Sequence, residues 1–358
     1  MSSPPWRYRH LLAAGGLLVA PLLLQQLGTG PVRIADQALL YVLLALGMNI
    51  VVGYAGLLDL GYVAFYAVGA YTFALSASPH LFEQFAGVRA MFPAGLHAPW
   101  WLVLPLGAGL AGVLGVLLGA PTLKLRGDYL AVVTLAFGEI LRLFVNNLAH
   151  PVNLTNGAHG ISQIDDLHLF GLDLRRTQVV LGMELAPVTL HYYLFLALVV
   201  LAVLVCHRLE RSRIGRAWMA IREDEVAAQA MGLNTRNLKL AAFGMGATFG
   251  GVAGGLFATF QGYVSPESFS LQESILVVAM VVLGGIGHLP GVVLGAVLLS
   301  ALPEVLRYAV GPLQAMTDGR LDAHILRQLL IALAMIGVML LRPQGLWTRP
   351  ERLNPPAR

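Results

Sequence analysis

Residues 189–207 read TLHYYLFLALVVLAVLVCH and hold no Lys, Arg, Asp or Glu. A helix needs about 20 consecutive apolar residues to cross the hydrocarbon core of a bilayer, and this run has that length and composition. The residues that follow, 208–236, contain six arginines. Because cytoplasmic loops of membrane proteins are enriched in Lys and Arg, these two segments predict a transmembrane helix that ends at the cytoplasmic face.

The composition of the whole chain is that of a membrane protein. Of its 358 residues, 57% are hydrophobic and 12% are charged, and the mean hydropathy is +0.72. An ordinary soluble domain has about 25% charged residues, and a soluble chain of this length would need more polar residues to cover its surface. The hydrophobic residues suffice for roughly ten spans. No polar linker divides the chain, so we expect one all-α membrane domain over residues 1–358.

Apolar runs punctuated by Pro, Gly and charge predict ten spans. Only Gly53-Tyr54-Ala55-Gly56 separates the second from the third, and the eighth is short. Short, Gly-interrupted segments are typical of helices broken at membrane depth, so we expect a break at Gly53, Gly56 and Gly61. The ten spans lie near residues 11–27, 34–55, 57–77, 100–120, 128–146, 189–207, 237–262, 274–287, 289–310 and 325–341.

The distribution of basic residues predicts the orientation. With the N-terminus inside, the inside segments 1–10, 121–127, 208–236 and 342–358 hold two, two, six and four Lys or Arg, which is 14 of the 23 in the chain. The longest outside loop, 147–188, is predominantly acidic. Ten spans therefore place both termini in the cytoplasm and residues 147–188 on the outer side, which is the periplasm if the membrane is a bacterial inner membrane, as the resemblance described below implies. Eight spans, which is also an even number, would place both termini in the cytoplasm as well.

Small residues recur every fourth position at Gly246, Gly250 and Gly254, and this spacing lets helix backbones approach closely. A faint similarity between the regions after Gly61 and Gly287 hints at an internal repeat.

Motifs for covalent chemistry are missing from the sequence. Both lysines, Lys124 and Lys239, follow leucine, so there is no P-loop for nucleotide phosphates. No His-Glu-x-x-His or Gly-x-Ser-x-Gly pattern occurs, and Cys206 is the one cysteine. We expect no catalytic residue, metal or cofactor, and the net charge of +4 gives no reason to expect a nucleic-acid partner. Nucleotide energy would have to come from another subunit.

The inside segment 208–236 has an apolar and a charged face. Trp218, Ile221 and Val226 offer apolar contacts, and Gly232 is typical of a helix C-cap. Such a segment either docks into a groove on a partner protein or rests on anionic lipid.

Residues Glu225-Val-Ala227-Ala228 followed by Gly232 resemble the EAA loop of ABC-importer permeases, which seats in a cleft of the ATPase subunit. The chain as a whole is similar to the LivM type of branched-chain amino acid permease. The matching blocks are GYAGLLDLGYVAFYAVGAY at 53–71, LKLRGDYLAVVTLAFGEILRLFVNN at 123–147, NGAHGI at 156–161, GGIGHLPGVVLGA at 284–296 and LLRPQGLW at 340–347.

This resemblance implies a fold like that of type II ABC importers, in the bacterial inner membrane. It implies that two cytoplasmic ABC ATPases, a sister LivH-type permease and a periplasmic substrate-binding protein are partners. Permeases for urea and short amides are similar, so the resemblance is less specific for the substrate. The residues that it assigns to ATPase coupling are Arg216, Arg222, Glu225, Ala227, Ala228 and Gly232.

Charged and polar residues inside the expected spans are candidates for the translocation path. Glu139 and Arg142 are three residues apart on one helix face, and Glu139 lies ~16 Å beyond Asp128, near the bilayer midplane. They either line the path or neutralise each other structurally. Asp59, where the family would have a small polar residue, either orients an ammonium group or accepts backbone N–H bonds. Asn146 is a weaker candidate.

Two other classes of function remain as alternatives. A secondary transporter would use Asp59, Asp128 and Glu139 as an ion relay, which leaves the EAA-like segment unexplained. A membrane-embedded enzyme would need a nucleophile or metal motif that the sequence lacks.

Overall fold

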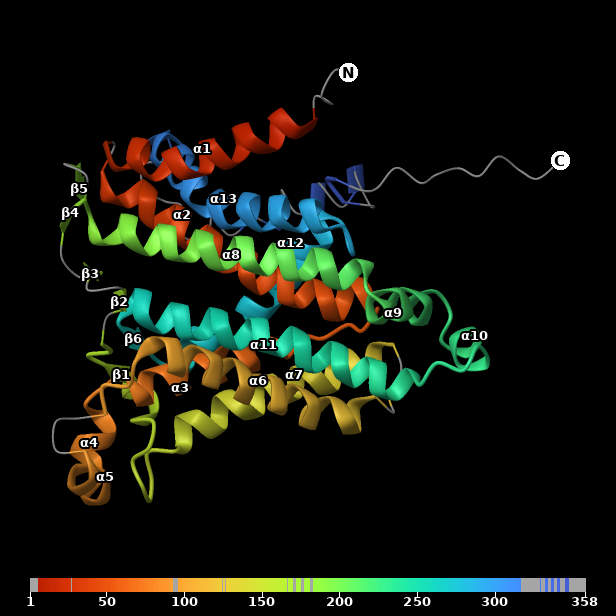
Figure 1. Cartoon of the computed structure of the whole chain (residues 1–358), viewed down its shortest axis with the longest axis horizontal. Coiled ribbons are helices and arrows are strands. Elements are labelled where there is room, and N and C mark those ends of the chain that lie inside the picture. The colour runs from red at the N-terminus through yellow and green to blue at the C-terminus, as the bar shows by residue number, and fades with distance from the viewer. Residues whose placement is uncertain are drawn as a thin grey trace.

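Nine apolar helices run roughly side by side in the computed structural model (Figure 1). The model describes residues 6–26, 28–92, 96–123, 125, 127–165, 167–169, 172–174, 177–180 and 183–316, with isolated residues between 329 and 347. Within that part of the chain the nine helices are α1 (Trp6–Gln26), α2 (Thr29–Met48), α3 (Val63–Ser76), α6 (Trp100–Thr122), α7 (Asp128–Asn147), α8 (Pro187–Arg211), α11 (Thr235–Gln261), α12 (Leu271–Gly284) and α13 (Leu289–Met316).

The helices confirm an all-α, polytopic membrane protein. Five helical segments are long and apolar enough to cross a bilayer: Thr29–Tyr54, Trp100–Thr122, Pro187–Arg211, Thr235–Gln261 and Leu289–Leu306. The other four helices coincide with expected spans 11–27, 57–77, 128–146 and 274–287. The tenth expected span, 325–341, lies mostly outside the described residues, so the number ten stays a prediction.

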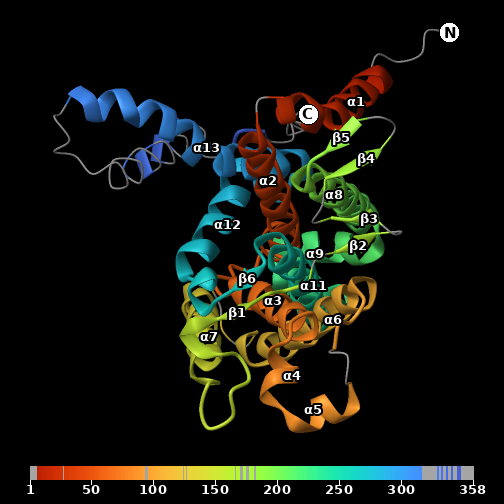
Figure 2. The ribbon, with the colours of Figure 1, turned by 90° about the vertical axis from the view of Figure 1, so that its left-hand side faces the viewer.

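Helix α11 is central because small residues cover both of its sides. Figure 2 shows it between α2, α3 and α6. On one side a Cβ atom at Gly246 would meet Val51, and one at Gly254 would overlap the carbonyl oxygen of Tyr66. On the other side a Cβ atom at Gly251 would lie 2.8 Å from the carbonyl oxygen of Gly107 on α6. The glycines therefore let three helices pack against α11 at backbone distance.

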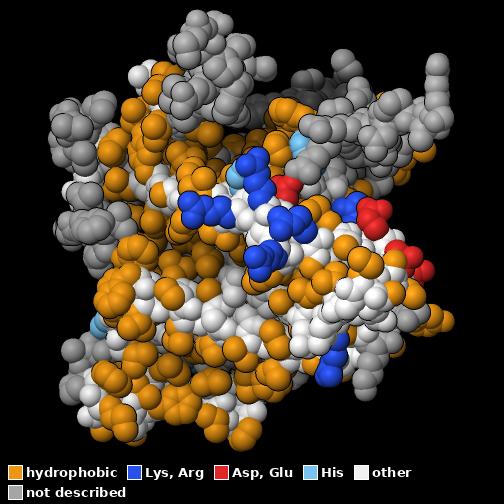
Figure 3. Space-filling view, turned by 45° about the vertical axis from the view of Figure 1, so that its right-hand side comes forward, with side chains coloured by type: hydrophobic (Ala, Val, Ile, Leu, Met, Phe, Trp, Pro, Cys, Tyr) orange, Lys and Arg blue, Asp and Glu red, His pale blue; other side chains and the backbone are white. Residues whose placement is uncertain are grey.

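The two ends of the bundle differ in character. At one end, here called the basic end, α9 (Arg213–Glu223) and α10 (Glu225–Ala230) connect α8 to α11. Exposed Arg208, Arg211, Arg213 and Arg216 lie there, and Figure 3 shows the cluster of basic side chains on this side. Helix α1 begins toward the same end (Figure 1). The side chains of residues 1–10, Lys124 and Arg126, and the basic residues of 342–358, lie outside the described ones, so the orientation stays a prediction.

The other end, here called the strand end, carries short structure that the sequence did not predict. Residues 147–188 contain η2 (Gly157–His159) and five strands of two or three residues, and a sixth follows α11. Strand β1 pairs with β6, so the long loop is held against the connection between α11 and α12, which also contains η3 (Pro266–Phe269). Helices α4 (His80–Gln84) and α5 (Ala86–Met91) lie at this end too (Figure 1). The strands are β1 (Ile161–Ser162), β2 (His168–Leu169), β3 (Leu172–Asp173), β4 (Gln178–Val180), β5 (Met183–Leu185) and β6 (Tyr263–Val264).

Gly254→Ala should destabilise the protein, because the added methyl group overlaps the backbone of α3 and cannot move away from it. Overpacking of this kind costs about 1–3 kcal/mol. We expect a lower melting temperature in detergent and less monodisperse protein. Gly109→Ala, on α6, is the matched control because nothing lies within 4 Å of the position of its Cβ. Equal melting temperatures for the two variants would contradict the packing described for α11.

Candidate functional site

A helix is interrupted inside the bundle. Helix α2 ends at Met48 and continues as a π-helix, η1 (Asn49–Tyr54), and the chain is then non-helical until α3 begins at Val63. Gly56 has a φ of +69°, which favours glycine. Ala55 and Leu57 are buried. Gly56 and Leu58, in contrast, are exposed at the wall of a cavity. The non-helical backbone is therefore partly enclosed by protein and partly lines this cavity, the two settings in which it is tolerated at membrane depth.

Side chains from two other helices satisfy the backbone of this break. Thr134 of α7 accepts a hydrogen bond from the backbone nitrogen of Leu60 at 3.0 Å. Ser274 of α12 donates to the carbonyl oxygen of Leu60 at 2.6 Å. Within the break, Asp59 Oδ1 accepts from the backbone nitrogen of Gly61 at 2.8 Å. The break thus has a defined conformation that depends on α7 and α12.

Asp59 is almost fully buried, and the cavity beside it has a volume of about 10 Å³. A cavity of that size holds about one water molecule, so no amino acid fits against this carboxylate in the present conformation. The contact with Gly61 is the backbone interaction that the sequence offered as the structural alternative for Asp59. Its role in transport stays a prediction.

A second break, between α12 and α13, meets the first. Gly285 and Gly287 have φ angles of +114° and +80° in this short connection. The backbone nitrogen of Gly287 donates to Asn49 Oδ1 at 2.9 Å, so the side chain of η1 holds the second break. A Cβ atom at Gly53 would lie 2.9 Å from the same Gly287 nitrogen. Two interruptions that are far apart in the sequence are therefore in direct contact.

Arg222 joins these breaks to the segment at the basic end. It lies in the last turn of α9, and its Nη1 donates to the carbonyl oxygen of Gly53 at 2.5 Å. Its Cγ lies 2.9 Å from where a Cβ of Gly56 would be, and its Nη1 lies 2.7 Å from where a Cβ of Gly287 would be. A single guanidinium group thus contacts both breaks.

The segment that carries Arg222 is folded firmly against the bundle. Ser212, Asp224 and Asn234 accept backbone hydrogen bonds at the starts of α9, α10 and α11. Trp218 is fully buried, and its Nε1 donates to the carbonyl oxygen of Leu238 at 2.7 Å. Glu225 Oε1 lies 2.6 Å from Lys239 Nζ. Movement of α9 and α10 would therefore be transmitted to α11.

The outer surface of the same segment is free of such contacts. Val226 and Met231 are 68% and 84% exposed. Gly232 has a φ of +84°, and nothing lies within 4 Å of the position of its Cβ. Of the other predicted coupling residues, Ala227 is exposed, Ala228 is buried, and Arg216 donates to the carbonyl oxygen of Arg211. The segment thus has a buried inner face and an exposed, partly apolar tip.

Glu139 and Arg142 form an ion pair on α7. Arg142 Nε lies 3.1 Å from both carboxylate oxygens of Glu139, and Nη2 lies 2.5 Å from Oε1. Their side chains are 41% and 30% exposed, so the pair lies at the surface of the subunit. Ile140 and Phe144 on the same helix are more than half exposed. Asn146 is half-buried one turn beyond Arg142.

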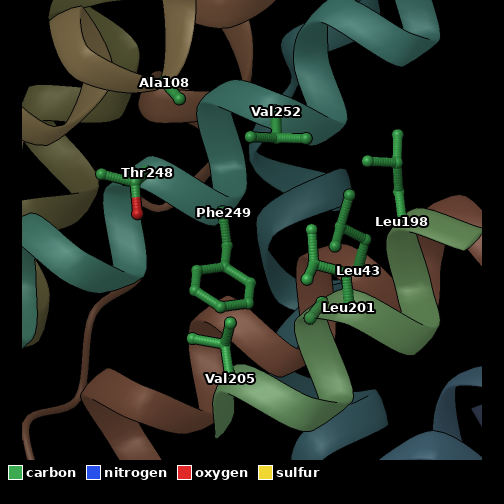
Figure 4. Close-up of a pocket in the computed structure, with 9 residues that line it drawn as sticks. Leu43, Ala108, Leu198, Leu201, Val205, Thr248, Phe249 and Val252 are labelled. Atoms are coloured by element: carbon green, nitrogen blue, oxygen red, sulfur yellow. The ribbon is translucent and has the colours of Figure 1, made fainter. Parts of the chain in front are cut away.

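An apolar cavity of about 270 Å³ between α2, α6, α8 and α11 is unsuited to a charged substrate (Figure 4). Leu43, Leu201 and Phe249 line it, and the hydroxyl of Thr248 already donates to the carbonyl oxygen of Met245. Leu201 and Val205 are about half exposed on the outer face of α8. This cavity offers no polar partner to an amino-acid head group.

Sequence reasoning missed a polar cluster on α2. Arg33, Gln37 and Tyr41 line a cavity at the strand end, together with Gln261 of α11. Arg33, Gln37 and Tyr41 follow one another at intervals of four residues, which places these three side chains on one face of α2. The sequence does contain this signal. Asp36 lies within expected span 34–55 and is fully buried, and neither of its oxygens has a hydrogen-bond partner among the described residues. Glu139 was selected because a charged residue inside an expected span is a candidate for the translocation path. The same rule would also have selected Asp36.

Comparison with known proteins identifies similar sequences over most of the chain. The model of the family "Branched-chain amino acid transport system / permease component" matches residues 30–340. The high-affinity branched-chain amino acid transport system permease protein LivM of Escherichia coli is 43% identical over 336 residues, which cover 90% of this chain and 71% of LivM.

More distant relatives match over a similar range. A probable LivM of Methanocaldococcus jannaschii is 27% identical, covering 88% of this chain and 93% of that protein. The permease protein LivH of Escherichia coli is 25% identical, covering 87% and 92%. No solved structure matches the chain.

Asp59→Ala should destabilise the protein by about 1–3 kcal/mol, because it leaves the buried nitrogen of Gly61 without an acceptor. Asp59→Asn keeps an acceptor oxygen and should have nearly the wild-type melting temperature. Thermal unfolding in detergent distinguishes the two. If the Asn variant melts like the Ala variant, the negative charge rather than the acceptor stabilises the break.

Proposed function

This chain belongs to the family of permease components of branched-chain amino acid transport systems, and on that premise we propose that it is a membrane-spanning subunit of an ATP-driven importer of branched-chain amino acids in the bacterial inner membrane. The observation that carries the proposal is the 43% identity to LivM over 90% of the chain. The subunit is a transport component, and ATP hydrolysis takes place on separate subunits.

The proposed assembly contains a sister permease of the LivH type. The chain is 43% identical to LivM and 25% identical to LivH of the same organism, which favours a LivM-like subunit that pairs with a LivH-like one. The half-exposed ion pair on α7 supports this arrangement, because a charged pair that faces lipid is costly. We place the sister permease over this face, so that Glu139 and Arg142 border the path between subunits.

Two ABC ATPase subunits dock at the basic end, and a periplasmic binding protein delivers the amino acid at the strand end. The exposed side chains of Val226 and Met231 form an apolar tip that fits a groove on the ATPase. The arginines around the tip match the predicted cytoplasmic side. An interfacial helix on lipid would not require the tight attachment of Trp218 and Lys239 to α11.

Arg222 carries the movement of the ATPases into the membrane domain. Its guanidinium group contacts the carbonyl oxygen of Gly53 and packs beside Gly287. A cavity of about 300 Å³ lies between the break, the start of α7 and the helices α9 and α10, here called the coupling helices, with Arg222, Asp128 and Lys239 among its lining residues. This space gives α9 room to shift relative to the break. A displacement of α9 would therefore act on both breaks together.

The geometry gives less support to an ion-coupled secondary transporter than to an ATP-driven permease. Of the three carboxylates in such a relay, Glu139 is paired with Arg142, and Asp59 accepts a backbone hydrogen bond in a cavity of about 10 Å³. A permease for urea or short amides would have the same coupling segment, and the substrate assay below separates it from an amino-acid permease.

Liposomes that contain this chain with its cognate sister permease and ATPases should accumulate leucine when ATP is enclosed on the ATPase side and leucine-loaded binding protein is added. Uptake should persist when a protonophore collapses the proton gradient at constant ATP. Urea and acetamide, offered in the same way, should not stimulate ATP hydrolysis. Uptake that follows the proton gradient, or stimulation by the amides alone, would contradict the proposal.

The same preparation tests the docking site. Met231→Glu should lower co-purification of the ATPase subunits, because it places a charge at the apolar tip. Met91→Glu is the matched control, since Met91 is 78% exposed at the strand end. Equal recovery of ATPase with both variants would place the docking site elsewhere.

Arg222→Ala should uncouple ATP hydrolysis from transport. Without the guanidinium group the coupling helices lose their hydrogen bond to the break, so we expect at least tenfold more ATP hydrolysed per leucine taken up. Arg213→Ala, an exposed arginine in the first turn of α9, is the control and should leave this ratio unchanged. A proportional loss of hydrolysis and uptake in Arg222→Ala would mean that the residue serves assembly instead.

A further inference from the structure

A polar cavity of about 310 Å³ opens between α2, α3 and α11 at the strand end. Figure 2 views the bundle from this end, with α2, α3, α11 and α12 around the region. The polar lining residues are Arg33, Gln37, Tyr41 and Gln261, and Phe257 and Phe260 supply aromatic surface. Its volume is at the lower end of the ~300–1,000 Å³ that small-molecule sites occupy.

One side of the cavity is cationic. The Nη2 atom of Arg33 donates to Gln261 Oε1 at 3.3 Å, and the guanidinium carbon lies 5.4 Å from the centre of the Phe260 ring. Arginine has five N–H donors, and this is the one hydrogen bond that Arg33 makes to a side chain of the described residues. The exposed guanidinium group can therefore bind a carboxylate through two parallel hydrogen bonds.

The adjacent wall is backed by a negative charge. The hydroxyl of Tyr41 donates to Glu273 Oε2 at 2.9 Å, and Glu273 is a half-buried residue of α12. Tyr41 lies two turns from Arg33 on the same helix, so one part of the cavity presents a guanidinium group and another presents a hydroxyl that is backed by a carboxylate. Phe257 and the Tyr66 ring, 5.4 Å apart, add an apolar surface. Such a surface suits an aliphatic side chain better than a polar one.

The cavity is also connected to the helix break. Glu273 contacts the Tyr41 hydroxyl, and the next residue, Ser274, donates to the carbonyl oxygen of Leu60. An occupant that displaces Tyr41 or Glu273 would therefore act on α12 close to its contact with the break.

We propose that this cavity is an entry site for the free zwitterion of an aliphatic amino acid, in which Arg33 binds the carboxylate and the hydroxyl of Tyr41, held by Glu273, faces the ammonium group. The inference rests on the proposed function and adds a binding site within the permease itself. The cavity is open and its polar residues are partly exposed, so binding is weak, as a site between delivery and translocation requires.

The direct test uses the purified complex of both permeases and the ATPases, without binding protein, in nanodiscs of phosphatidylcholine. The melting temperature is measured while L-leucine, leucinamide (which lacks the carboxylate) or 4-methylpentanoate (which lacks the ammonium group) is titrated. Leucine should stabilise the complex at lower concentration than either analogue. Arg33→Gln should raise the half-maximal leucine concentration at least tenfold and remove the preference for leucine over leucinamide.

Arg89→Gln is the matched control. Arg89 is an exposed arginine at the same end, and its guanidinium carbon also lies 5.4 Å from an aromatic ring, that of Phe82. It does not line the cavity, so its substitution should leave the leucine titration unchanged. Tyr41→Phe keeps the ring and removes the link to Glu273, so it should weaken leucine but not 4-methylpentanoate. If the complex with Arg33→Gln does not assemble, the leucine titration is made with Tyr41→Phe and Arg33→Lys instead.

Two results would overturn the entry site. One is an unchanged leucine titration in Arg33→Gln and Tyr41→Phe, with the complex intact. The other is Arg33-dependent stabilisation by phosphatidylglycerol in place of leucine, which would make the cavity a site for a lipid head group. Either result leaves ATP-driven leucine uptake by the wild-type complex untouched. Failure of that uptake would refute the proposed function separately.

Discussion

Every backbone N–H and C=O group in the membrane interior must have a hydrogen-bond partner within the protein, and the centre of this structure is arranged around that constraint. The chain leaves helical geometry between Tyr54 and Val63, and Thr134, Ser274 and Asp59 supply the missing partners. The second break is held in the same way by Asn49. Several polar residues of this apolar chain, Asn49, Asp59, Thr134 and Ser274, are thus the partners of non-helical backbone.

The same constraint explains the placement of Arg222. Arg222 supplies a donor to the carbonyl oxygen of Gly53, which the π-helical end of α2 exposes toward the basic end. The same side chain therefore connects α9 to the break. Glu139 and Arg142 pair with each other at the surface of the subunit. A hydrogen bond that satisfies the backbone at Gly53 therefore also joins α9 to the centre of the fold.

Much of this architecture could be predicted from residue type and spacing. Runs such as 189–207 give the spans because length and hydropathy alone decide whether a helix crosses a bilayer. The break after Gly53 could be predicted from the sequence because Gly53 and Gly56 interrupt an apolar run there. The partners of the break could not be predicted, since Thr134 and Ser274 look like ordinary polar residues of their own helices and gain meaning only through contacts across the fold. The short strands between residues 161 and 185 could not be predicted, because a segment of two or three residues is too short to show a periodic pattern.

Asp36 and Arg33 show where reasoning by single residues is insufficient. Asp36 is one turn from Arg33 on α2, yet it is fully buried, whereas Arg33 is exposed in the cavity at the strand end. A buried carboxylate without a hydrogen-bond partner among the described residues is costly unless a positive charge is close. Arg33 lies on the outer turn of α2, and the glycine-mediated packing of α11 brings Gln261 and Phe260 to it. The cationic wall of the cavity therefore follows from the same close packing that makes α11 the centre of the bundle.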